Sequence, residues 1–338
     1  MIRTLNKIQS TKLANLPTPL EEAPRLADKI GLSKLFIKRD DLTGLAGGGN
    51  KARKLEYDFA GIIMGGYDVV ITAGGIQSNH ARMTSAAARK FGLDVKLVLG
   101  GPDFEIIKGN LLLDVLFGAE IRYLVNDDSN DHLTVAMEKW ADELLSKGHK
   151  PFIIPIGGST GLGALGYVKA MHEIAGQFGG DKVQIILGVG SCGTFAGTIL
   201  GCKIFLPNSR VIGVSVSRTS AAIDIRTKEI IRESAKLIDY KIETSKLYVE
   251  CYDDYFSEYG VITKECEQAI LDCANLEGIL LDPIYTGKVM AGLIGLVEKK
   301  IVDKSIPVIF LHTGGMPILF SFESELSKYA TYIKIKNI

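Results

Sequence analysis

Short apolar runs rich in valine and isoleucine alternate with longer helical patterns along this chain. These runs stand at residues 35–38, 68–72, 95–99, 152–154, 183–189, 211–216 and 306–311. Runs of this kind are typical of strands buried on both faces, as in parallel sheets that are covered by helices. Their alternation with helices predicts an α/β protein with parallel-type twisted sheets flanked by helices.

The order of these patterns indicates two domains. Residues 52–156 hold a strand–helix alternation of their own, with a polar turn at residues 126–131. We predict that this segment is a smaller α/β domain inserted into a larger domain formed by residues 1–51 and 157–338. The glycine-rich stretch 157–166 returns the chain to the larger domain, and we expect it to act as a hinge or a ligand-facing loop.

Composition and charge narrow the choice of partner. Of 338 residues, 46% are hydrophobic and 23% are charged, which is ordinary for a globular protein with a sizeable core. Lysine plus arginine number 39, as do aspartate plus glutamate, so we expect no net attraction to nucleic acid or to an anionic membrane. A small-molecule partner is therefore predicted.

Cysteine and histidine predict neither a disulfide framework nor a metal site. The five cysteines are odd in number and form no Cys-x-x-Cys pair, so we expect reduced core thiols. His172-Glu173 begins like a zinc-protease helix, but Gly176 stands where the second histidine is required. No run has the pattern of a signal peptide or a membrane helix, so a cytoplasmic location is expected by default.

One lysine stands where its amine can become reactive. Lys51 follows the glycine-rich turn 44–49 and opens the predicted helix Ala52-Arg53-Lys54-Leu55-Glu56. The positive field at a helix N-terminus disfavours the ammonium form of such a lysine, which favours nucleophilic chemistry. Lys51 is therefore a candidate for a Schiff base, although most single lysines are solvated surface charges.

A second glycine-rich turn joins a buried strand to an apolar helix and has the sequence Gly190-Ser191-Cys192-Gly193-Thr194. Its backbone N–H groups and the helix dipole can hold a phosphate without a cationic side chain. The glycines at 188, 190 and 193 also match the dinucleotide spacing G-x-G-x-x-G, but no acidic ribose partner follows the next strand, where Arg218 could serve a 2′-phosphate. We favour a monophosphate over a dinucleotide or a purely structural turn.

Three other loops carry candidate site residues. Gln77-Ser78-Asn79-His80 follows the strand at 68–72, and Ser78 is expected to cap the next helix, bind a carboxylate together with the first helical amides, or do both. Tyr285 and Thr313 each lie in a loop bracketed by proline or glycine, where functional side chains are often placed.

Taken in order, these pieces resemble a known group of enzymes, the pyridoxal-phosphate enzymes of the tryptophan-synthase-β fold (fold type II). Within it, the chain is similar to the family of 1-aminocyclopropane-1-carboxylate (ACC) deaminase and D-cysteine desulfhydrase. The similar segments span nearly the whole chain and are FIKRDDLTGLAGGGNKARKLE, TAGGIQSNHARMTSAAARKFG, VGSCGT, SEYG, LDPIYTGKVMAGL and LHTGG. The resemblance implies a two-domain α/β enzyme with pyridoxal 5′-phosphate in the cleft between the domains.

The resemblance also implies roles for the candidate residues. Lys51 would carry the cofactor as a Schiff base, and Asn79 would hydrogen-bond its phenolic oxygen. The cofactor's phosphate would lie on the turn formed by Gly190, Ser191, Cys192, Gly193 and Thr194, although related turns often carry glycine in place of Cys192. The substrate would meet Gln77, Ser78, Asn79, His80, Tyr259, Tyr285 and Thr286.

Two positions distinguish the activities within this family. ACC deaminases typically carry Tyr-Glu-Gly-Lys and a leucine before the later Gly-Gly, where this chain has Thr286 and Thr313. A carboxylate beside the pyridine nitrogen keeps the ring protonated and strongly electron-withdrawing, which a threonine hydroxyl does less well. We expect ring opening of a cyclopropane to need the stronger electron sink, whereas loss of sulfide does not. Both positions favour the desulfhydrase, and we assign the pyridine contact to Thr313.

The sequence therefore predicts a pyridoxal-phosphate-dependent lyase that converts D-cysteine to pyruvate, sulfide and ammonia. Lys51 is the expected base, and Ser78, Tyr259 and Tyr285 are further catalytic candidates. ACC deamination, L-cysteate sulfo-lyase activity and racemisation are alternatives on the same cofactor. An NADP-binding reductase and a non-catalytic amino-acid binder are alternatives of a different class. The resemblance also suggests a homodimer.

Overall fold

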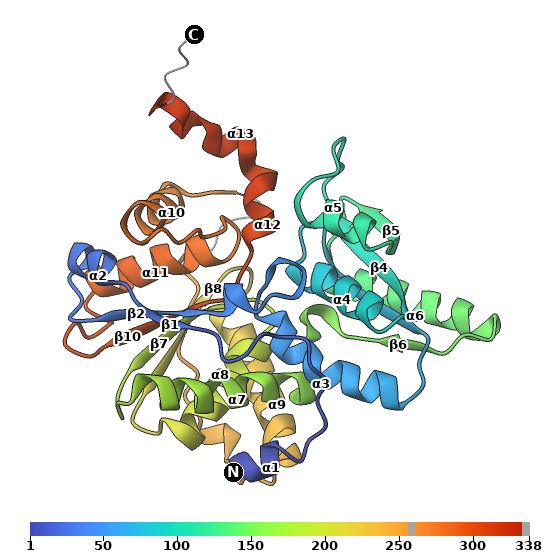
Figure 1. Ribbon diagram of the computed structural model, residues 1–338, viewed down its shortest axis with the longest axis horizontal. Coiled ribbons are helices and arrows are strands. Elements are labelled where there is room, and N and C mark those ends of the chain that lie inside the picture. The colour runs from blue at the N-terminus through green and yellow to red at the C-terminus, as the bar shows by residue number, and fades with distance from the viewer. Residues whose placement is uncertain (256–260, 333–338) are drawn as a thin grey trace.

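Two separate sheets, each with helices on both faces, form the described part of the protein (Figure 1). The computed structural model describes residues 1–255 and 261–332. Its strands are β1 (Leu20–Glu22), β2 (Leu35–Arg39), β3 (Val69–Gly75), β4 (Asp94–Gly101), β5 (Glu120–Val125), β6 (Pro151–Ile153), β7 (Gln184–Val189), β8 (Arg210–Ser215), β9 (Cys251–Tyr252) and β10 (Val308–His312).

The α-helices follow the strands in alternation over most of the chain, as the sequence predicted. They are α1 (Ile2–Leu5), α2 (Pro24–Ile30), α3 (Lys51–Met64), α4 (Asn79–Lys90), α5 (Gly109–Leu116), α6 (Asn130–Ser146), α7 (Gly161–Phe178), α8 (Gly193–Phe205), α9 (Ser220–Leu237), α10 (Lys264–Glu277), α11 (Thr286–Glu298), α12 (Met316–Leu319) and α13 (Glu323–Leu326). No described helix is long and apolar enough to cross a membrane.

The larger sheet has the strand order β1-β2-β10-β7-β8-β9 and is parallel except for the antiparallel edge pair β1–β2. Side chains of β7 alternate between its two faces, as the strand period requires. Ile185 and Leu187 pack in the core under α7, α8 and α9, whereas Ile186 packs in the core under α2, α10 and α11. The sheet is therefore buried on both sides.

The smaller sheet has the order β5-β4-β3-β6 and is parallel throughout. Val70 packs in one core with residues of α3 and α4, and Val69 and Ile71 pack in another with residues of α6. All four of its strands fall within residues 52–156. The division of the chain into two domains at these boundaries stays a prediction.

The predicted parallel strands are confirmed, with ends that differ by a few residues. Missing from the sequence prediction are β1, β5 and β9, which are edge strands of the two sheets. An edge strand is only partly covered, so it does not present a continuous apolar run. In β5, for example, Glu120 and Arg122 interrupt the apolar residues, and none of its side chains is fully buried.

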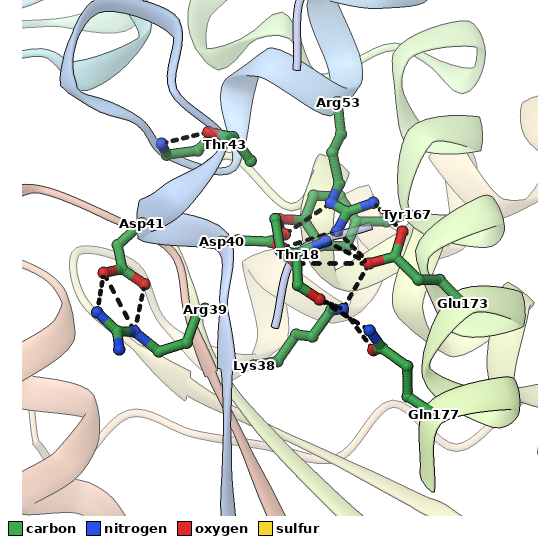
Figure 2. A network of polar contacts seen from close by, with 11 residues as sticks. Thr18, Lys38, Arg39, Asp40, Asp41, Thr43, Arg53, Tyr167, Glu173 and Gln177 are labelled. Atoms are coloured by element: carbon green, nitrogen blue, oxygen red, sulfur yellow. Dashed lines mark hydrogen bonds and ion pairs between the residues drawn. The ribbon is translucent and has the colours of Figure 1, made fainter. Parts of the chain in front are cut away.

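A buried polar cluster ties the start of α3 to β2 and α7 (Figure 2). The carboxylate of Asp40, directly after β2, accepts hydrogen bonds from Arg53 Nε at 2.9 Å and from Arg53 Nη2 at 2.8 Å. Tyr167 Oη on α7 donates to it at 2.5 Å, and Thr18 Oγ1 donates at 2.7 Å. Glu173, also on α7, pairs with both Arg53 and Lys38.

This cluster is charged and almost dry, so its members depend on one another. Asp40 and Lys38 are fully buried and Arg53 is 1% exposed. Burial alone would raise the pKa of Asp40, but the adjacent Arg53 guanidinium outweighs it and the pKa is lowered. The ionised pair therefore stabilises the fold above the ordinary carboxyl range, and this contribution is lost as the pH falls through the lowered pKa.

Replacement of Asp40 by alanine is expected to lower the free energy of unfolding by about 3 kcal/mol or more at neutral pH, because it leaves the buried Arg53 charge without its main partner. Urea unfolding followed by tryptophan fluorescence measures this. Asp94→Ala is the matched control, since Asp94 pairs with Arg89 on the surface, where both side chains are more than a third exposed. It should cost less than about 1 kcal/mol. Equal losses for the two variants would contradict the assigned role of the buried cluster.

Candidate active site

A cavity of about 350 Å³ lies where the carboxyl ends of strands from the two sheets meet. The chain leaves β3, β7 and β10 at this edge, and ligands of open α/β sheets bind at such edges. The volume is sufficient for a cofactor-sized ligand. The residues that line it are Asn50, Lys51, Gly74, Gly75, Ser78, Asn79, His80, Asp128, Asn130, Leu133, Ile156, Gly157, Gly188, Val189, Gly190, Ser191, Cys192, Thr194, Phe195, Val216, Ser217, Arg218, Ile284, Tyr285 and Thr313.

Lys51 is the first residue of α3 and faces this cavity. Its amine forms no hydrogen bond with any residue that the structure describes. Burial lowers the pKa of Lys51 from 10.5 to about 8, so about a tenth of the amine is uncharged at pH 7, far more than for an ordinary lysine. The structure therefore supports the reactivity that the helix-start position predicted.

The turn before Lys51 has a backbone that only glycine can adopt without strain. Gly48 has φ +80°, and a Cβ on it would lie 1.8 Å from the carbonyl oxygen of Asp41. Thr43 Oγ1 fixes the neighbouring peptide, since it donates to Gly49 O at 2.9 Å and accepts from Gly49 N at 2.7 Å. Asn50 then ties the turn to the opposite wall, because its Nδ2 donates to Thr194 Oγ1 at 3.0 Å.

The turn 190–194 presents free donors to the cavity from the N-terminus of α8. Among the described residues no acceptor takes the backbone N–H groups of Ser191, Cys192 and Thr194. Cys192 has φ +70°, the left-handed conformation in which glycine is more comfortable, which agrees with its departure from related turns. A helix start with unpaired amides is an anion site by construction.

A cation behind this turn was missed in the sequence analysis. Lys54 is fully buried, and its Nζ donates to Gly157 O at 2.5 Å and to Ser159 Oγ at 3.2 Å. A Cβ on Gly193 would lie 2.7 Å from that Nζ, so Lys54 sits directly against the start of α8. Helix periodicity could have revealed it, since residues i and i+3 share one face and Lys54 is three residues after Lys51.

These groups place positive charge in the protein without a matching carboxylate. No described carboxylate lies within ion-pair distance of Lys54, and burial together with the Lys51 charge lowers its pKa well below the ordinary value. The nearest acid acting on it is Asp58, whose own pKa burial raises to about 7, against the opposing effects of Lys54 and Thr160. A bound phosphate would supply the missing negative charge.

The start of α4 forms a second set of donors. Ser78 is the N-cap, and its Oγ accepts from Ala81 N at 3.2 Å, as the capping interpretation predicted. The backbone N–H groups of Asn79 and His80 have no acceptor among the described residues. They are available to a carboxylate in the cavity.

The His80 imidazole is neutral, and its Nε2 is engaged by Thr72. Thr72 Oγ1 donates to Ile154 O at 2.8 Å, so it accepts from His80 Nε2–H at 2.9 Å. Burial and the charges of Lys54 and Lys51 lower the pKa of His80 well below its usual value. Its Nδ1 is then an acceptor that no described donor satisfies.

Two predicted substrate residues, Gln77 and Thr286, are not among the residues that line the cavity. The Gln77 side chain accepts from Asn110 N at 2.8 Å and donates to Lys108 O at 3.0 Å, so it caps the start of α5. The Thr286 hydroxyl donates to Asp282 Oδ2 at 2.8 Å and accepts from Asp282 N at 2.8 Å. Their contact with substrate stays a prediction.

Of the remaining predicted residues, two line the cavity, one supports its wall and one lies outside the described residues. Tyr285 and Thr313 line the cavity, and Thr313 O accepts from Asn50 N at 2.9 Å beside Lys51. Gly193 supports the turn from within α8. Tyr259 lies outside the described residues.

Comparisons with known proteins decide which ligand fits this site. A family model described as "Pyridoxal-phosphate dependent enzyme" matches residues 11–314. The chain belongs to this family. It is 40% identical to a D-cysteine desulfhydrase from Klebsiella pneumoniae over 96% of this chain and 99% of that protein. It is also 41% identical to a solved structure called an ACC deaminase homologue, with a TM-score of 0.90 over 97% of this chain and 98% of that one.

Family membership confirms the predicted fold and the predicted class of enzyme. A tomato (Solanum lycopersicum) threonine deaminase, only 19% identical, shares the fold with a TM-score of 0.69 over 97% of this chain and 88% of that one. The protein is thus a pyridoxal-phosphate-dependent lyase of fold type II. The residues present fit the cofactor, because an unpaired amine and a helix-start anion site face one cavity, and a buried lysine without an ion-pair partner among the described residues lies directly behind the anion site. The reductase interpretation of the glycine motif loses its support.

The pH dependence of cofactor attachment tests the state of Lys51. Only an uncharged amine attacks an aldehyde, so the rate at which cofactor-free protein binds pyridoxal phosphate covalently should rise to half its maximum near about pH 8. Stopped-flow absorbance measures this rate, with Nα-acetyl-lysine as the reference for an ordinary amine. A profile that follows the reference compound would contradict the assignment. Lys51→Ala should abolish borohydride-stable attachment altogether.

Removal of the Lys54 charge should weaken cofactor binding without preventing attachment to Lys51. A hydrogen bond to a charged group contributes about 1.5–3 kcal/mol, so Lys54→Met is expected to raise the Kd for pyridoxal phosphate by roughly 10-fold to 100-fold. Fluorescence titration of cofactor-free protein gives the Kd. Lys203→Met, at the exposed far end of α8, is the matched control and should leave the Kd unchanged. An unchanged Kd for Lys54→Met would remove Lys54 from the phosphate site.

Proposed function

We propose that this lyase acts on D-cysteine and releases pyruvate, sulfide and ammonia by β-elimination. The observation that carries the proposal is that Thr313 lines the cavity, whereas no carboxylate from the loops of the larger sheet is among the described lining residues. Among the described residues that line the cavity, Asp128 is the single carboxylate, and it comes from the loop between β5 and α6 of the smaller sheet. The Thr286 hydroxyl is occupied by Asp282, so Thr313 is left to face the pyridine nitrogen.

The cofactor supplies an electron sink for the substrate's α-carbon when it is bound. The chain's own residues then hold the substrate and move the proton. The free amides of Asn79 and His80 and the Ser78 hydroxyl would bind the substrate carboxylate at the start of α4. Lys51, with a pKa near 8, would take the α-proton at neutral pH, and Tyr285 would act near the leaving sulfur.

We also expect a homodimer in the cytoplasm, on the basis of the family resemblance and the sequence pattern. An amino acid is the expected substrate, and neither nucleic acid nor a membrane is expected as a partner. The gel-filtration mass of the cofactor-loaded protein would test the dimer directly.

The test of the proposal compares three substrates on the cofactor-loaded protein. D-cysteine, L-cysteine and ACC are incubated separately, and sulfide and the keto acid are quantified in each. Sulfide and pyruvate in equal amounts from D-cysteine, with little from L-cysteine, are the expected result. Production of 2-oxobutyrate from ACC at a comparable rate would make the protein an ACC deaminase. No product from any of the three would point to other leaving groups, such as the sulfonate of L-cysteate, or to a binder.

The double variant Thr286→Glu with Thr313→Leu tests the two positions together and is expected to raise the ratio of ACC to D-cysteine turnover at least about 10-fold, equivalent to roughly 1.4 kcal/mol of altered transition-state stabilisation. Asp282 accepts hydrogen bonds from three backbone N–H groups and from the Thr286 hydroxyl. A glutamate at 286 removes the hydroxyl donor and places a second negative charge beside Asp282. Thr286→Ser keeps that hydroxyl and is the matched control. An unchanged ratio in the double variant would show that these positions do not select the reaction.

A further inference from the structure

We infer that Arg82 and Asn110 are positioning residues that hold the Asn79 side chain with its amide nitrogen toward the cofactor. The inference rests on the proposed contact between Asn79 and the phenolic oxygen of pyridoxal phosphate. It adds two residues, on α4 and α5, that are not among the described residues lining the cavity.

The hydrogen bonds around Asn79 fix which end of its amide faces the cavity. Asn79 Oδ1 accepts from Asn110 Nδ2 at 2.9 Å and from Arg82 Nη2 at 3.3 Å. A guanidinium has no acceptor, so the atom of Asn79 that meets it must be the oxygen. The amide nitrogen of Asn79 is then left as a donor for the cavity.

The orientation of Asn110 is fixed independently. Its Nδ2 also donates to the backbone carbonyl of Gln77 at 2.8 Å, and a carbonyl can only accept. Asn110 is fully buried at the start of α5, and its backbone N–H is held by the Gln77 side chain. Arg82 and Asn110 can therefore only donate to the Asn79 side-chain oxygen. A flipped Asn79 amide would place its own N–H groups against these two donors.

Arg82 also holds the turn that carries Lys51. Its Nη1 donates to Ala46 O, and its Nη2 donates to Gly48 O at 3.1 Å. The side chain is fully buried, so these carbonyls and Asn79 are its environment in place of water. One guanidinium thus ties the Lys51 turn to the Asn79 amide, and both Lys51 and Asn79 line the cavity.

The charge of Arg82 strengthens the donor that Asn79 offers. Burial lowers the pKa of Arg82 to about 10, against the opposing charge of Asp114, so the guanidinium stays charged at neutral pH. Asp114 on α5 has a pKa that burial raises to about 7. The titratable groups that line the cavity together with Asn79 are Lys51, His80, Asp128, Cys192, Arg218 and Tyr285. A cation on the amide oxygen polarises the amide, which strengthens its N–H bond to a phenolate.

A stronger donor to the phenolate makes the bound cofactor harder to protonate. The pH at which its visible absorbance titrates should therefore rise when the donor is weakened. We expect Asn110→Ala and Arg82→Met each to raise this midpoint by about one pH unit, a tenfold change in the protonation constant. The measurement is a spectroscopic pH titration of the loaded protein without substrate.

A double-mutant comparison separates positioning from general damage. If Asn110 acts through Asn79, Asn110→Ala should shift the midpoint in the normal chain but add nothing in the Asn79→Ala background. Ser85→Ala is the matched control, because Ser85 is a fully buried residue of α4 that bonds Asp114 Oδ1 at 3.0 Å without touching Asn79. It should lower stability and leave the midpoint in place.

The outcomes distinguish this inference from the proposed contact on which it rests. An unchanged midpoint in Asn79→Ala would show that Asn79 does not meet the phenolic oxygen. A shift in Asn79→Ala with none in Asn110→Ala and Arg82→Met would overturn the positioning role alone, as would an equal shift in Ser85→Ala. Where Arg82→Met fails to fold, the smaller change Asn110→Ala decides.

Discussion

The buried pair of Arg53 and Asp40 determines where the reactive lysine can be. Arg53 is two residues after Lys51, so the register of α3 is fixed at the point where the helix meets the cavity. Asp40 follows β2 directly, and Tyr167 and Glu173 bring α7 to the same point. A buried charge is very costly without its partner, so the helix cannot slide along its axis without breaking this cluster.

Two buried arginines from different helices fix the position of the Lys51 turn. Arg53 fixes α3 through its hydrogen bonds to Asp40, and Arg82 on α4 donates hydrogen bonds to carbonyls of the turn itself. Glycine is needed at 48 because a Cβ there would lie 1.8 Å from Asp41 O. Position 49 favours glycine because its φ is +135° and a Cβ would meet Thr313 O at 3.2 Å. The hydrogen bonds of the buried Arg82 to Ala46 O and Gly48 O, together with those between Thr43 and Gly49, therefore restrict this run of glycines.

A residue's position in the site can be predicted from the sequence when its structural environment is formed by its neighbours along the chain. Lys51, the 190–194 turn and the Ser78 cap are each defined by the few residues around them, so pattern reasoning places them at helix starts. Gln77 is different, because its side chain accepts a hydrogen bond from the backbone of Asn110, 33 positions away in the sequence. The contact of the Thr286 hydroxyl with Asp282 is likewise not predictable from residue types alone. Edge strand β5 can be recognised only from the sheet that it joins. Lys54 was overlooked because a lysine is ordinarily a surface residue.

The uncompensated charge of Lys54 also has a thermodynamic meaning. Burial of a cation against a helix start lowers the free energy of unfolding, and an anion bound there raises it again. Because the ligand binds the native state and not the unfolded chain, its concentration enters the stability directly, by about 2.7 kcal/mol at 100 times the Kd. Bound cofactor is therefore expected to stabilise the fold in addition to supplying the activity.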